Sequence, residues 1–171
     1  QLKKEEILNF YESNVNNQFH TIRTHIAQTI LINVLLGIAE GAFEESKNYV
    51  KSKTRPWLSS KVDSAEYDPY ILHKYGNLYV QLKAAAALSE KAAVAVQEIW
   101  NQGKDITELE RGSCGITVAT AKVAVAKAAL EVSNGIFEVM GARSTSGKYG
   151  YDRYWRNIRT HTLHDPLDYK I

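Results

Sequence analysis

The chain has 171 residues, of which 44% are hydrophobic and 23% are charged, with a formal net charge of +2. This composition suits one folded domain and excludes wholesale disorder, and the small, dispersed charge argues against a nucleic-acid partner. A single cysteine, Cys114, excludes an internal disulfide framework and a zinc site built on paired cysteines, and near a helix start we interpret it as structural.

The first 16 residues are polar and mixed, and we interpret them as a lead-in from an upstream domain, with one helical turn at residues 5–11. The first residue is Gln and the chain stops abruptly at Ile171, so we expect a part of a longer protein. No secretory signal is visible, and the apolar stretch 26–39 is shorter than the roughly 20 residues that cross a bilayer. The sequence therefore predicts a cytoplasmic protein without membrane contact.

A first long helix is predicted over residues 17–53. Its apolar residues recur every four positions: Ile22, Ile26, Ile30, Val34, Ile38 and Ala42. With Ala27, Leu31 and Leu35 beside it, this stripe is wider than one neighbouring helix needs, so we expect a homo-oligomer, a dimer or a tetramer. Pro56 then ends the helix, and residues 54–66 are predicted to form a loop.

Two further long helices have clear start signals. Asp68 is a good N-cap before Pro69, and the second helix is expected to run to Trp100 and end near Gly103. A capping box, Thr107 with Glu110, opens the third helix, which Gly141 ends. The predicted apolar seam of this third helix consists of Ile116, Ala119, Val123, Ala126, Leu130, Ser133, Phe137 and Met140.

A Gly/Ser loop over residues 144–150 and a shorter helix over 151–163, stopped by Pro166, complete the prediction. The fold class is therefore all-α: an up-down helical bundle of three long helices and a shorter C-terminal helix, spanning residues 17–171.

Side chains that could bind an anion or transfer a proton are most frequent near the C-terminus. They are Arg143, Arg153, Arg156, Arg159, His161, His164 and Asp165. An acid–base site beside an anionic cofactor and a solvated helix end both fit this set, and a metal site lacks enough ligands. The turn at Gly141 would let an anion approach Arg143. Taken alone, Arg143 and Arg55 fit better the ordinary role of a surface arginine at a helix C-terminus, where the helix dipole attracts cations.

Several separated motifs resemble a known family. The run from Phe137 to Arg143, followed by residues 149–159, is similar to the C-terminal helical domain of the acyl-CoA dehydrogenase superfamily. In the dehydrogenases a Glu removes a substrate proton, whereas here Asp165 stands at that position before Pro166, and this difference argues against dehydrogenation. Residues 54–57, 68–70, 141–143 and 155–166 more closely resemble two-component flavin monooxygenases of the dibenzothiophene monooxygenase type.

This resemblance implies an enzyme that takes reduced FMN from a separate reductase and oxygenates a sulfur-containing or other small apolar substrate. It implies that Arg55 and Arg143, beside the Gly141 turn, hold the flavin phosphate from a neighbouring subunit. It also implies that His164 assists the oxygen chemistry near the flavin ring, with His161 as a second candidate. The family's upstream domains are not in these 171 residues, so we expect the chain alone to be inactive.

Two alternatives stay open from the sequence. One is an acyl-CoA dehydrogenase that uses FAD, and the other is a non-catalytic helical assembly module.

Overall fold

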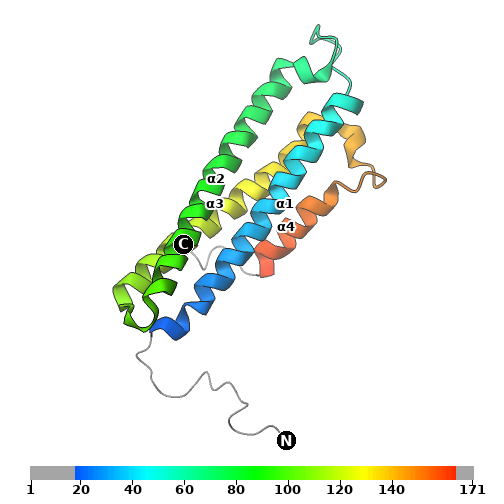
Figure 1. Ribbon diagram of the computed structural model, residues 1–171. Coiled ribbons are helices and arrows are strands. Elements are labelled where there is room, and N and C mark those ends of the chain that lie inside the picture. Colours follow the sequence, from blue (N-terminus) through cyan, green and yellow to red (C-terminus); the bar gives the residue numbers. More distant parts are fainter. Residues whose placement is uncertain (1–17, 165–171) are drawn as a thin grey trace, which may run out of the picture.

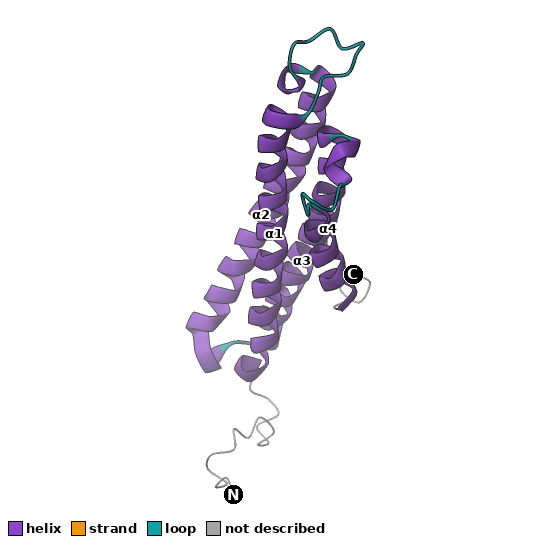
Figure 2. Ribbon diagram, turned by 90° about the vertical axis from the view of Figure 1, so that its right-hand side faces the viewer, coloured by secondary structure: helices purple, strands orange, loops and turns teal. Residues whose placement is uncertain are grey.

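Four α-helices form the bundle in the computed structural model, which describes residues 18–164 (Figure 1). They are α1 (Arg23–Lys53), α2 (Pro69–Gln102), α3 (Glu108–Met140) and α4 (Asp152–His164), with 3-10 turns at Gln18–Thr21, Ala65–Tyr67, Gly103–Asp105 and Ala142–Thr145. Residues 18–164 contain no strand, as Figure 2 also shows. The all-α prediction is confirmed. The expected turn at residues 5–11 and the stop at Pro166 lie outside the described residues.

The capping hydrogen bonds expected at the starts of the second and third helices are present. The Asp68 carboxylate accepts the backbone N–H of Tyr70 at 2.9 Å and of Ile71 at 3.5 Å. Thr107 and Glu110 complete the capping box, because each side chain accepts the other residue's backbone N–H. Gly103 and Gly141 end α2 and α3 with φ of 63° and 82°, values that favour glycine.

The buried face of α1 differs from the predicted stripe. Ile32, Leu35 and Ala39 are fully buried, whereas Ile30 and Val34 are 58% and 45% exposed. A strict repeat of four residues drifts by about 40° per step around a helix of 3.6 residues per turn. The predicted stripe therefore crosses from the core to an apolar outer surface of α1.

The predicted single seam of α3 is also wrong in detail. Ile116, its first member, is 71% exposed, while Val118, Val125, Val132 and Ile136 are buried. Helix α3 packs against α1, α2 and α4, so its buried residues surround much of its circumference. Even a lysine is enclosed here: Lys122 is 1% exposed, and its Nζ donates to Gln28 Oε1 at 2.8 Å.

Two helical segments of the described chain, Gln18–Lys53 and Glu108–Met140, are long and apolar enough to cross a membrane by length and composition. Core helices of soluble proteins often pass the same test, and part of each segment is buried in the bundle. These segments are therefore weak evidence for a membrane span.

Candidate functional site

Arg55 and Arg143 lie at the same end of the bundle, although 88 positions separate them in the sequence. Helices α1 and α3 finish side by side there, and the Thr54 hydroxyl donates to the Met140 carbonyl oxygen at 3.1 Å. Gly141 then turns the chain into the 3-10 segment Ala142–Thr145, in which Arg143 is exposed. The predicted pairing of the two arginines is therefore compatible with the fold.

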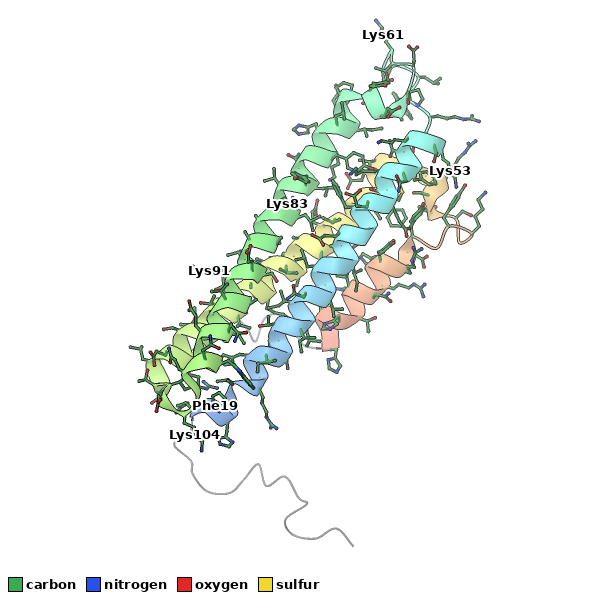
Figure 3. The ribbon with its side chains drawn as sticks, viewed as in Figure 1. Phe19, Lys53, Lys61, Lys83, Lys91 and Lys104 are labelled. Atoms are coloured by element: carbon green, nitrogen blue, oxygen red, sulfur yellow. The ribbon has the colours of Figure 1, made fainter. Side chains whose placement is uncertain are left out.

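Two lysines and a tyrosine that the sequence did not indicate lie beside these arginines. Lys53, in the last turn of α1, and Lys148, in the loop before α4, each place Nζ 4.8 Å from the ring centroid of Tyr149 (Figure 3 labels Lys53). The Tyr149 ring packs edge-on against buried Tyr49 at 5.2 Å between centroids. We call Lys53, Arg55, Arg143 and Lys148 the basic end.

The pKa shifts of Tyr149 and Tyr49 reflect the positive charges around these two phenols. A hydrogen bond from Lys148 is the main cause that lowers the pKa of Tyr149. Burial raises the pKa of Tyr49, and the charge of Arg143 partly opposes that rise. Because Arg143 and the two lysines all act on this tyrosine pair, their positive charges share one small region.

The basic end has an excess of positive charge. None of its four cations forms a salt bridge with a carboxylate among residues 18–164. Two helix C-termini contribute roughly half a negative charge each, which offsets only about one of the four cations. An exposed group of uncompensated cations with planar guanidinium donors fits a phosphate group.

Carboxylates on the helices that reach this end are engaged elsewhere. Arg153 Nη2 donates to Glu45 at 2.8 and 2.9 Å, and its Nη1 donates to the Gly150 carbonyl at 3.0 Å. Arg156 pairs with Asp152 at 3.0 Å. Of these two arginines, which the sequence grouped with the chemical cluster, Arg153 attaches α4 to α1, and Arg156 forms its ion pair within α4.

His161 and His164 lie at the other end of α4 from the basic end. Thirteen residues separate the first and last positions of this helix by roughly 18 Å. His164 is exposed and His161 is half-buried, with its Nδ1 buried and without a hydrogen-bond partner among the described residues. The structure thus separates the predicted histidines from the predicted arginines of the same chain, and Asp165 lies outside the described residues.

His25 and the cysteine fit structural roles. His25 is buried, with Nε2 3.3 Å from the Arg111 carbonyl oxygen, and burial lowers its pKa. Cys114 is buried, which raises the pKa of its thiol. Within residues 18–164, no group of three or more His, Cys, Asp or Glu residues could hold a metal ion.

A groove of about 420 Å³ also lies between α1 and α2. Its lining is mainly apolar and aromatic, including Phe43, Ile71, Tyr75 and Tyr79. None of the predicted site residues lines this groove.

Comparisons with known proteins agree with the fold and with the motifs. Residues 29–169 match the family "Acyl-CoA dehydrogenase, C-terminal domain". The chain is 47% identical over 146 residues to dibenzothiophene monooxygenase of Mycolicibacterium goodii, covering 85% of this chain and 35% of that protein. It is 43% identical over 157 residues to a probable FMNH2-dependent monooxygenase, SfnC, of Pseudomonas putida, covering 92% of this chain and 40% of the relative.

Solved structures show the same likeness. Methanesulfinate monooxygenase MsuC of Pseudomonas fluorescens superposes with a TM-score of 0.88 at 46% identity, covering 91% of this chain and 40% of that one. FMN-bound TdsC of Paenibacillus sp. A11-2 gives a TM-score of 0.85 at 40% identity, covering 89% and 38%. The chain spans 35–40% of the length of the curated relatives it matches. Because the family match extends over most of its length, the chain belongs to the acyl-CoA dehydrogenase C-terminal domain family.

Proposed function

We propose that this chain is the C-terminal helical domain of a two-component flavin-dependent monooxygenase that uses reduced FMN from a separate reductase. The basic end is the observation that carries the proposal, because its four cations, which have no carboxylate partner among residues 18–164, suit the phosphate of FMN. The names of relatives at 43–47% identity support the same activity, on a sulfur-containing or other small apolar substrate. We expect a cytoplasmic enzyme.

Each candidate residue has a role that its position suits. Arg55 and Arg143 would bind the phosphate with guanidinium donors, and the Gly141 turn, which carries no side chain, would leave room beside them. His164 would hold or donate a proton at its imidazole nitrogen close to the reacting oxygen, with His161 beside it. Reduced flavin, when bound, would supply the electrons that activate O2.

The proposed site draws on two copies of the chain. The basic end and His164 of one chain lie at opposite ends of α4, so a neighbouring copy would bring its arginines to this chain's histidine. Exposed apolar residues on α1, including Ile30 and Val34, offer a surface for such a dimer or tetramer.

Oxygenation by the full-length protein tests the function. With reduced FMN from a flavin reductase, the protein is assayed on dibenzothiophene and on methanesulfinate, and we compare His164→Gln with His161→Gln. Loss of the proton donor should lower the oxygenation rate by about a hundredfold or more. The matched control is His20→Gln, an exposed histidine in the 3-10 turn before α1.

Equal rates for His164→Gln, His161→Gln and His20→Gln would contradict the assigned role. Reduction of bound flavin by an acyl-CoA without any reductase would instead favour a dehydrogenase.

A further inference from the structure

We propose that Lys53 and Lys148, which both contact the ring of Tyr149, form a second cationic pair that binds the phosphate monoester of reduced FMN together with Arg55 and Arg143. This inference rests on the proposed function and adds to it two binding residues from separate parts of the chain.

The contacts bring both ammonium groups to one aromatic ring. Each Nζ lies 4.8 Å from the Tyr149 ring centroid, and Lys53 also lies 5.7 Å from the ring centroid of Tyr49. Tyr49 is buried and packs edge-on against Tyr149, so the ring that both lysines contact has a rigid support. The aromatic contacts therefore hold together two flexible side chains that start 95 positions apart.

These contacts leave N–H donors for an anion. An ammonium group has three donors, and a cation–π contact with a ring face needs none of them as a conventional hydrogen bond. Lys148 lies close enough to the Tyr149 phenol to lower its pKa. Both lysines are exposed, so the remaining donors can reach a ligand from solvent.

The charge balance favours a multiply charged ligand. Two arginines and two lysines face roughly one negative charge from the ends of α1 and α3. A phosphate monoester has a second pKa near 6, so it carries between one and two negative charges at neutral pH and has three terminal acceptor oxygens. A neutral flavin without its phosphate would leave the four cations uncompensated.

Flavin binding by the full-length protein tests this assignment. Dissociation constants of reduced FMN and reduced riboflavin are measured anaerobically for wild type, Lys53→Gln, Lys148→Gln and the double variant. Each substitution should weaken FMN binding by about threefold to tenfold, while the riboflavin constant stays within about twofold because that ligand lacks the phosphate. Inorganic phosphate should compete with FMN in wild type and compete less in the double variant.

Lys104→Gln is the matched control, since it removes the same charge at the opposite end of the bundle (Figure 3). FMN binding by the lysine variants equal to that of the control would overturn the inference. Equal weakening of FMN and riboflavin would also overturn it, since the lysines would then only support the fold. If wild type itself binds riboflavin as tightly as FMN, the phosphate site of the proposed function fails as a whole.

Discussion

Asp68 sets the start of α2, and its carboxylate accepts backbone N–H groups of the first turn. Asp68→Ala leaves these donors without a side-chain acceptor, so it should lower the free energy of unfolding by about 1 kcal/mol. Urea denaturation measures the difference. Asp63→Ala, an exposed loop aspartate without a capping bond, is the control and should change stability little. An equal effect of the two substitutions would contradict the assigned cap.

Tyr75 predicts a pH dependence of stability. Burial is the main cause that raises its pKa to about 12, and a hydrogen bond to Ser46 at 3.0 Å partly opposes the rise. The unfolded chain loses this proton near the ordinary value of 10.0, so the folded state binds more protons between about pH 10 and 12. Stability should therefore be unaffected by this group below pH 10 and fall as the pH rises through that window.

Denaturation midpoints at pH 9 and pH 11 measure this effect. Tyr75→Phe should make the fall smaller, without abolishing it, because burial also raises the pKa of Tyr151 and Tyr154. Tyr70→Phe, at an exposed position of the same helix, should leave the fall unchanged. A fall of the same size in both variants would rule out Tyr75 as a source.

At the scale of elements, Arg153 attaches α4 to α1. It hydrogen-bonds Glu45, the Tyr154 phenol and the Gly150 carbonyl oxygen, so Arg153→Met should cost about 1–2 kcal/mol. Arg156→Met removes only an exposed pair with Asp152 and should cost less than about 0.5 kcal/mol. Hydrogen exchange should quicken in α4 for the first variant only. Equal exchange in both would contradict this attachment.

Gly135 sets the close approach of α2 and α3. A Cβ atom there would meet Leu78 Cδ2 at 3.0 Å and Lys74 Cε at 3.2 Å, whereas one at Gly112, also in α3, would meet nothing within 4 Å. Gly112→Ala should stabilise the protein by about 0.5–1 kcal/mol through helix propensity. Gly135→Ala should be less stable than Gly112→Ala by about 1–2 kcal/mol. Thermal denaturation measures the stabilities of the two variants. Equal stabilities of Gly135→Ala and Gly112→Ala would contradict the tight contact.

The sequence predicts the ends of these elements better than their faces. Asp68, the capping box at Thr107 and the glycines at 103 and 141 act on neighbouring backbone, so local chemistry suffices. Which face of a helix is buried depends on how many neighbours it has. Ile30 is exposed because the core face of α1 drifts relative to a four-residue repeat. Helix α3 packs against three helices, so its buried residues do not form the single predicted seam, whose first member, Ile116, is exposed.

At the scale of the whole molecule, the sequence names candidate residues but groups them differently from the fold. It treats Arg143 and His164 as one C-terminal cluster, and the length of α4 separates them. It does not indicate Lys53 and Lys148, because their contacts with Tyr149 arise only when the ends of α1 and α3 meet. The family resemblance supplied the roles of Arg55 and Arg143, and the fold brings their backbones to one end.

A site shared between two copies is the central claim, and mixing two inactive full-length variants tests it. One variant carries Arg55→Gln with Arg143→Gln, and the other carries His164→Gln. After random exchange of subunits in an equal mixture, half of the pairs are mixed, and one of the two sites in each mixed pair has both intact halves. The mixture should therefore regain about one quarter of the wild-type oxygenation rate. Mixed assemblies that form but stay as inactive as either variant alone would contradict the account.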